Sequence, residues 1–224
     1  MTISLLHEDD DLEILFEDDH LAVLNKPPGL VTEGEEGSDL QSLLHNKFNR
    51  EVVLFHRLDK ATSGVILIGK TRRWNREISE LFSKKRLRKS YWAMVEGRWL
   101  REWNRVETFI RRGKRGLMEN HPSLGKNALT TFHLLKGTES LSWIQAMPKT
   151  GRTHQIRLHC LQKAHPIIGD ELYGGGSAPL ALHAESLSFR HPGTGQSIQV
   201  KAKPPAYWQK WFDQLGGAKN KEVD

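Results

Sequence analysis

The sequence predicts an α+β protein with a mixed, mostly antiparallel central sheet and flanking helices and loops. Short apolar or alternating stretches bounded by glycine and proline, which are typical of strands, outnumber the stretches with helical spacing. These strand signals do not alternate regularly with helices, so a doubly wound parallel sheet is disfavoured. The 224 residues contain no internal repeat or long linker and suffice for a sizeable core.

Composition divides the chain into three segments. Residues 1–18 are expected to form an acidic arm, because residues 1–19 contain eight acidic side chains and no lysine or arginine. Residues 19–215 are expected to form the folded domain. Residues 216–224 are expected to be a disordered tail, as chain ends commonly are.

The first elements are two short strands over residues 14–25. Prolines follow the second strand and end it, because proline cannot donate to a strand ladder. Ser38, with Gln41 three residues later, predicts a capping box at the start of a short helix. This helix would turn three leucines inward, namely Leu40, Leu43 and Leu44.

A polar segment, residues 56–64, runs directly into the β-branched apolar run 65–68, which reads as a buried strand. The segment contains one carboxylate, Asp59, between Arg57 and Lys60, and nearby cations favour its ionised form. A strand behind it would aim this side chain from a rigid scaffold, so Asp59 is a candidate reactive group. The alternative is an aspartate that caps a turn.

A second helix is expected after Thr71, which is placed to cap it. Its inward side chains recur at helical spacing: Trp74, Ile78, Leu81 and Phe82. Its other faces would form a basic ridge of Arg72, Arg73, Arg76, Lys84 and Lys85.

Strand signals dominate the rest of the chain. Residues 89–95 alternate and place Tyr91 on one face with Ala93 and Val95. Further strands are expected near 105–110, 129–135, 141–147, 180–189 and 197–202, with a glycine-rich basic loop at 112–126. A short helix within 150–165 would bury Ile156, Cys160 and Leu161. A terminal amphipathic helix over 205–215 would bury Trp208, Trp211 and Phe212.

Charge points to a polyanionic partner. The formal net charge is +6, and residues 70–115 contain 16 lysines and arginines against 5 acidic residues. A concentrated basic block of this kind is typical of nucleic-acid binding, which is salt-dependent. A membrane surface is disfavoured, because no basic amphipathic helix with a broad apolar face is evident. Part of such an excess is ordinary solvated surface.

The remaining composition fits a cytoplasmic protein. The single cysteine, Cys160, excludes an intramolecular disulfide and suits a reducing compartment. No apolar run approaches the length of a membrane span, and the N-terminus lacks a signal-peptide pattern.

Arg157 is the candidate partner of Asp59. On the predicted helix, Ile156 and Cys160 are four residues apart and face the core, so Arg157 leaves that face. Its planar guanidinium suits a bidentate grip on a carboxylate, and the alternative is a pair with surface acids.

Metal and hydrolase chemistry are disfavoured. Three histidines crowd one stretch, but the two on the helix, His154 and His159, are five residues apart and do not share a face. Structural histidines are the preferred interpretation. The glycines at 174–176 lack a phosphate-loop frame, and Ser63 is not in a nucleophile-elbow motif.

Five motifs in family order resemble those of the RluA-type pseudouridine synthases. The central one is His56-Arg57-Leu58-Asp59-x-x-Thr62-Ser63-Gly64. It is flanked by Leu24-Asn25-Lys26-Pro27-x-Gly29-Leu30 and by Lys89-x-Tyr91-x-Ala93-x-Val95-x-Gly97. Gly151-Arg152-Thr153-His154-Gln155-Ile156-Arg157-x-His159 follows with Pro166-Ile167-x-Gly169-Asp170-x-x-Tyr173-Gly174, and Leu182-His183-Ala184 with His191-Pro192 completes the set. Together the motifs cover roughly residues 19–205.

The resemblance implies a pseudouridine-synthase fold with its active-site cleft across the sheet, and residues 19–215 as a catalytic domain without an appended RNA-binding module. It implies isomerisation of uridine in structured ribosomal or transfer RNA to pseudouridine after base flipping. Asp59 would be the catalytic carboxylate, Tyr91 would lie against the uracil, and Arg157 would hold Asp59 ionised. Expected RNA-contacting or supporting residues are Lys26, His56, Arg57, Thr62, Arg111, Arg112, Lys114, Arg115, Arg152 and His154.

The resemblance also implies no metal or organic cofactor, no membrane and no protein partner, so a monomer is expected. A catalytically inactive RNA-binding module or chaperone on the same fold is the alternative, and the presence of Asp59, Tyr91 and Arg157 disfavours it. A phosphate-processing enzyme would need a cluster of metal-binding carboxylates, which the sequence does not show.

Overall fold

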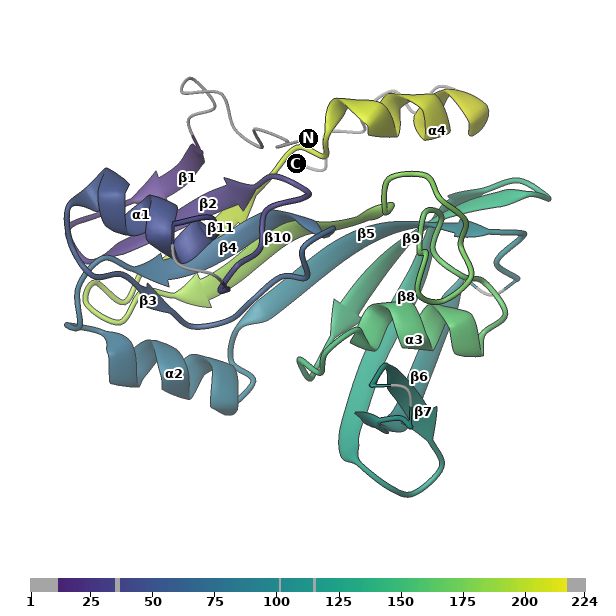
Figure 1. Cartoon of the computed structure of the whole chain (residues 1–224), viewed down its shortest axis with the longest axis horizontal. Helices are drawn as coiled ribbons and strands as arrows, with labels where there is room; N and C mark the ends of the chain where they lie inside the picture. The colour runs from purple at the N-terminus through teal and green to yellow at the C-terminus, as the bar shows by residue number, and fades with distance from the viewer. Residues whose placement is uncertain (1–11, 35–36, 101, 115, 217–224) are drawn as a thin grey trace.

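A central sheet organises the chain, as Figure 1 shows for the computed structural model, which describes residues 12–34, 37–100, 102–114 and 116–216. Within these residues eleven strands form one sheet in the order β1-β2-β4-β10-β5-β9-β8-β6-β7, while β11 pairs with β10 and β3 pairs with β4. Every pair is antiparallel except β4 with β10, which are parallel. The predicted mixed, mostly antiparallel sheet is confirmed.

The elements alternate irregularly along the chain, as the strand-rich sequence predicts. The strands are β1 Glu13–Glu17, β2 Leu21–Lys26, β3 Val53–Leu54, β4 Ser63–Gly69, β5 Arg88–Glu96, β6 Trp103–Arg112, β7 Met118–His121, β8 Lys126–Gly137, β9 Leu141–Pro148, β10 Leu182–Arg190 and β11 Ser197–Lys201. The helices are α1 Leu40–Phe48, α2 Asn75–Ser83, α3 Gln155–Gln162, a 3₁₀ turn at Ala206–Trp208 and α4 Gln209–Gln214.

Strand β4 is buried on both faces, which explains its continuous apolar run. Val65 and Leu67 pack in one cluster with Ile78 of α2, whereas Ile66 and Ile68 pack in another with Leu40 and Leu44 of α1. Successive side chains of a strand point to opposite faces, so one strand joins two cores. The segment before β4, which contains Asp59, is therefore anchored on a rigid element.

The other half of the sheet has its own core. Ala93 and Val95 of β5 pack there with Ile156 of α3 and with Trp208 and Trp211 near the C-terminus. Strand β5 runs between the two halves in Figure 1, with α2 below the left half, α3 beside β8 and β7 in the right half, and α4 at the top. The predicted inward faces of these helices are confirmed, except that Leu161 is 40% exposed.

Two predicted helix starts are wrong. Asp39, rather than Ser38, is the N-cap of α1, and its carboxylate accepts the Ser42 N–H at 2.8 Å. Helix α2 begins at Asn75 and not directly after Thr71. The Thr71 hydroxyl accepts the Arg73 N–H at 3.3 Å in the turn before the helix and also lies 3.0 Å from the ring of His20.

Two further boundaries differ from the prediction. The expected loop at 112–126 contains the short strand β7, which pairs with β6. Residues 13–17 form β1 and pair with β2, as the strands expected over 14–25 predict. The boundary of the acidic arm at residue 18 had included these residues in the arm. The rest of the arm, residues 1–11, and the tail 217–224 lie outside the described residues.

Candidate active site

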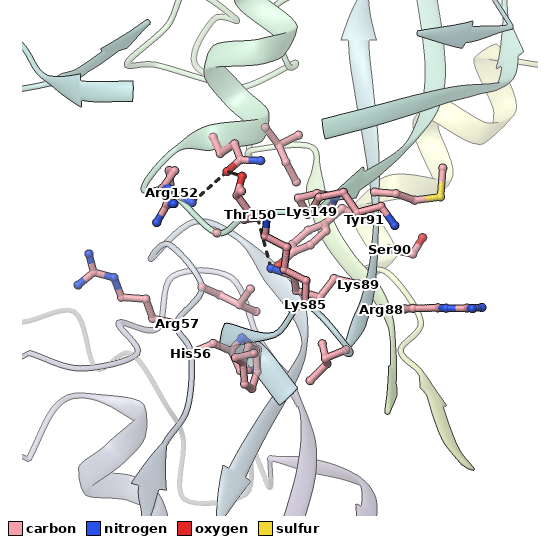
Figure 2. A pocket seen from close by; sticks show the side chains of 18 of the residues that line it. His56, Arg57, Lys85, Arg88, Lys89, Ser90, Tyr91, Lys149, Thr150 and Arg152 are labelled. Carbon is pink, nitrogen blue, oxygen red and sulfur yellow. Dashed lines mark hydrogen bonds between the residues drawn. The ribbon is translucent and has the colours of Figure 1, made fainter. Parts of the chain in front are cut away.

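A cleft of about 1290 Å³ opens between the β3–β4 connection, the segment leading into β5 and the turn between β9 and α3. Its lining contains eight lysines and arginines: Arg57, Lys85, Arg86, Arg88, Lys89, Lys149, Arg152 and Arg157. Asp59 is the one carboxylate among the described residues that line it. Figure 2 labels Arg57, Lys85, Arg88, Lys89, Lys149 and Arg152 among the side chains that line this cleft. The arrangement suits a polyanion that brings a neutral group to a single carboxylate.

Asp59 lies on the turn before β4, where its carbonyl accepts the Thr62 N–H at 3.0 Å. Its side chain is 27% exposed, so it is open to the cleft. Gly64, at the start of β4, has φ +111°, and a Cβ there would lie 2.2 Å from the Ala184 carbonyl oxygen. Glycine is therefore required for the close approach of β4 to β10 that anchors this turn.

Arg157 contacts Asp59, as predicted, but its main partner is different. Its Nη1 lies 3.4 Å from Asp59 Oδ2. Its Nε and Nη2 donate to the two carboxylate oxygens of Asp170 at 2.8 and 2.6 Å. Burial acts to lower the pKa of Arg157, but the hydrogen bonds and charge of Asp170 raise it overall, with a smaller contribution from Asp59. The predicted pair of Arg157 with Asp59 is present, and Asp170 is a second carboxylate partner that lies closer to the guanidinium.

Tyr91 lines the cleft from β5 and packs against the core under α1. Burial raises the pKa of its phenol above the ordinary value, and the negative charge of Asp59 adds to this effect. Tyr91 is therefore a neutral phenol at neutral pH. It offers a flat apolar face and one hydroxyl donor beside the carboxylate.

Lys26 is fully buried and does not reach the cleft. Its ammonium donates to the carbonyls of Pro27, Leu30 and Lys60 at 2.8, 2.8 and 3.3 Å. Burial lowers its pKa to about 7, against an opposing effect of Asp59. Lys26 thus ties two loops together beneath the Asp59 turn, and its support of Tyr91 stays a prediction.

Two predicted contact residues beside Asp59 are mainly internal. The His56 ring accepts the Leu67 N–H at 2.9 Å and packs on Phe82, and burial together with Lys89 lowers its pKa to about 3. His56 is therefore neutral and supports the strand. Thr62 lines the cleft but is 2% exposed, and within the described part of the chain its hydroxyl has no hydrogen-bond partner.

Arg57 and Arg152 stand at the cleft entrance (Figure 2). Arg57 is exposed and donates to Thr153 at 3.3 Å, while Arg152 donates to the Asn127 carbonyl at 3.0 Å. Gln155 holds the turn beneath Arg152, because its side-chain oxygen accepts the Arg152 N–H at 3.0 Å. The predicted roles of both arginines in RNA binding stay predictions.

The 111–114 region is remote from this cleft. Arg111 pairs with Glu119 at 2.8 Å, Arg112 and Lys114 are exposed, and none of the three lines the cleft. Arg115 lies outside the described residues. The RNA-binding role expected of this loop therefore stays a prediction without support from the cleft geometry.

Sequence reasoning missed several cleft residues. Arg86, Arg88 and Lys89 belong to a dense basic run that leads into β5 and includes its first two residues; the sequence places this run in the basic block but not at the site. Lys149 follows β9 on the opposite wall. In the sequence Asp170 stands out only as part of a motif. Apart from its distance from Arg157 along the chain, nothing in the sequence predicts that the two residues pair.

His154 lies between Asp59 and Tyr173. Its Nδ1 is 2.8 Å from the Tyr173 hydroxyl and its Nε2 is 3.8 Å from Asp59 Oδ2. Burial lowers its pKa, against an opposing effect of Asp59, so the ring is neutral at neutral pH. His159, in contrast, is enclosed between the hydroxyls of Thr108 and Thr130 and is a structural histidine, as predicted.

The chemistry available here is that of a carboxylate, a phenol, a neutral imidazole and many cations. Within the described residues there is no group of three or more His, Cys, Asp or Glu arranged to hold a metal ion. No helix in that part of the chain is long and apolar enough to cross a membrane.

This fold is that of a family of RNA-modifying isomerases. Residues 20–162 match the model of the RNA pseudouridylate synthase family, and the chain belongs to that family. The predicted family, its fold and its reaction class, isomerisation of uridine in RNA, are confirmed at this level.

Named relatives agree. Ribosomal large subunit pseudouridine synthase C of Yersinia pestis is 37% identical over 210 residues, which cover 84% of this chain and 64% of that protein. The uncharacterized RNA pseudouridine synthase YhcT of Bacillus subtilis is 36% identical, with 91% of this chain and 72% of that protein covered. The chain thus spans roughly two thirds of the length of these relatives.

Solved structures show the same architecture. Human RNA Pseudouridylate Synthase Domain Containing 4 superimposes with a TM-score of 0.75 at 25% identity, covering 91% of this chain and 92% of that one. Human RNA Pseudouridylate Synthase Domain Containing 1 gives a TM-score of 0.73 at 26% identity, covering 87% and 84%.

Proposed function

We propose that this chain converts uridine to pseudouridine in structured ribosomal RNA, with Asp59 as the reactive carboxylate. The observation that carries the proposal is the cleft itself, in which eight basic side chains surround one described carboxylate. The basic walls would neutralise RNA phosphates, and the target nucleotide would leave its stack to reach Asp59. Ribosomal RNA is the proposed substrate because the Yersinia pestis relative carries that name.

The reaction needs no net addition of atoms. The N1–C1′ bond breaks, the uracil turns, a C5–C1′ bond forms, and the proton lost from C5 is balanced by one gained at N1. Asp59 would act either by attack at C1′ or as the base that opens the glycosidic bond. Arg157 would keep it ionised, and the neutral phenol of Tyr91 would lie against the uracil and assist proton removal from C5.

Two supporting assignments complete the proposal. The domain would act in the cytoplasm, where ribosomal RNA is available, and as a monomer. The alternative, an inactive RNA-binding module, would show affinity for the RNA without any product.

Asp59→Asn is the test. The change is nearly isosteric and removes only the charge, so pseudouridine formation should be abolished while RNA affinity and folding are retained. The substrate would be ribosomal RNA from source cells lacking the gene, and the product would be mapped by chemical labelling of pseudouridine under single-turnover conditions. Glu139→Gln, which removes an exposed carboxylate paired with Arg98, is the matched control for net charge.

Equal rates for Asp59→Asn and wild type would refute the role of Asp59. Absence of product with wild type, together with tight RNA binding, would favour the inactive binding module.

A further inference from the structure

The hydrogen bonds around Tyr173 determine which nitrogen of His154 carries the proton. The Tyr173 hydroxyl donates to the Met118 carbonyl at 3.1 Å, and a carbonyl can only accept. The same hydroxyl lies 2.8 Å from His154 Nδ1. The one assignment that pairs both contacts directs the hydroxyl proton to the Met118 carbonyl, so that the hydroxyl oxygen accepts from Nδ1–H. In the neutral ring, Nε2 is therefore the unprotonated nitrogen.

This nitrogen faces another acceptor. His154 Nε2 and Asp59 Oδ2 are 3.8 Å apart, beyond hydrogen-bond distance. The two side chains are 18% and 27% exposed, so a ligand can reach both. A donor group placed beside Nε2 would satisfy this nitrogen, whereas Asp59 Oδ2 already lies 3.4 Å from the Arg157 donor Nη1. A buried or half-buried acceptor left without a donor costs free energy.

The position of His154 is also unusual. Its φ is +56°, in the left-handed region that a residue other than glycine rarely adopts. Asp59, His154 and Arg157 are the three residues shared by the large cleft and a second cavity of about 540 Å³. The pair of acceptors thus stands where the two cavities meet, at the place where the proposed chemistry occurs.

We propose that His154 Nε2 accepts a hydrogen bond from the 2′-hydroxyl of the target nucleotide, so that the enzyme selects a ribonucleotide at the reacting position. The inference rests on the proposed function, in which Asp59 acts at C1′ or on the bond to it. Inside an RNA strand the 2′-hydroxyl is the one donor of the ribose, and it lies two bonds from C1′. The N3–H donor of uracil is three bonds away, on the base that must turn.

The test is a cycle of two proteins and two RNAs. His154→Asn keeps a residue that tolerates the left-handed backbone but is too short to place an acceptor at Nε2. The RNAs carry uridine or 2′-deoxyuridine at the mapped site. The preference is the single-turnover rate on the uridine RNA divided by the rate on the 2′-deoxyuridine RNA. It should be about tenfold larger for wild type than for His154→Asn, because the loss of one hydrogen bond that leaves its acceptor unpaired has about that effect.

Tyr173→Phe separates this role from a structural one. It keeps the ring that Arg157 covers at 5.1 Å but removes the hydroxyl that selects the tautomer. It should reduce the preference for uridine in the wild-type background and have no further effect on that preference in the His154→Asn background. Circular dichroism and melting temperature report whether each variant folds.

A preference for uridine that is unchanged in His154→Asn, whatever the absolute rates, overturns the proposal. If wild type isomerises neither RNA, the proposed function has failed. In that case fluorescence anisotropy measures the dissociation constants of the two RNAs for the two proteins. An equal preference for the uridine RNA in wild type and His154→Asn again overturns the role of His154.

Discussion

Asp170→Asn should destabilise the protein, because it removes the main counter-charge of a buried arginine. The Asp170 side chain is 1% exposed and that of Arg157 is 7% exposed. Two hydrogen bonds of 2.6 and 2.8 Å join them, and Asp170 also accepts the N–H groups of Leu172 and Tyr173 at 3.2 Å. Asparagine keeps the shape but presents an NH₂ group to the guanidinium.

Breaking a buried ion pair by removal of one partner costs about 3–5 kcal/mol. Asp59, 3.4 Å from Arg157, remains as a second counter-charge, so we expect the lower end, about 3 kcal/mol. For a domain of this size that corresponds to a fall in melting temperature of roughly 6–12 °C.

Urea unfolding followed by circular dichroism measures the change directly. The double variant Arg157→Met, Asp170→Asn removes both charges and should recover much of the loss, because no buried charge is then left unpaired. A loss below about 1 kcal/mol for Asp170→Asn, or a double variant that is the sum of the singles, would refute the view of Asp170 as the principal partner.

Two lysines give further predictions. Lys89 lines the cleft, burial lowers its pKa to about 8, and its ammonium lies 3.5 Å from the Thr150 carbonyl. Lys89→Met should lower the slope of log RNA affinity against log salt concentration by about one unit or less, because one phosphate contact is lost. Filter binding measures this slope, and Lys163→Met, an exposed lysine outside the cleft, is the control. Equal slopes for wild type and Lys89→Met would contradict the prediction. Lys26 has a folded pKa of about 7, so between that pH and 10.5 the unfolded chain binds a proton that the folded chain has released. The free energy of unfolding should therefore rise with pH in this window in wild type and not in Lys26→Met. Urea unfolding at pH 7 and pH 9 measures the change, and an equal rise in the two proteins would contradict the prediction.

Helix starts show where local patterns mislead. Ser38 with Gln41 satisfied the capping-box pattern, yet Asp39 caps α1. Thr71 accepts the N–H of Arg73 in a turn before α2 and also contacts His20, 51 residues away, but it does not cap the helix. Side chains that suit a cap also suit other partners, and the packed fold decides which contact forms.

Strand β7 shows a second kind of limit. Its sequence, Met-Glu-Asn-His, has no apolar alternation, so nothing local predicts a strand. It forms because it pairs with β6 at the edge of the sheet. Pairing with a neighbour can outweigh intrinsic preference in so short a strand.

Residues that are neighbours in the chain were enough to place Asp59 at the entrance to a buried strand, to predict the α+β sheet and to show the basic character of the molecule. Strand period and local charge are properties of adjacent residues, so they can be read in order. The partner of Arg157, the cations of the cleft and the proton position on His154 depend on distances between segments brought together by folding. Asp59 and Arg157 are 98 residues apart in the chain, and His154 and Tyr173 are 19 apart. Because hydrogen bonds and ion pairs require separations of about 3 Å, such contacts follow from packing and not from spacing along the sequence.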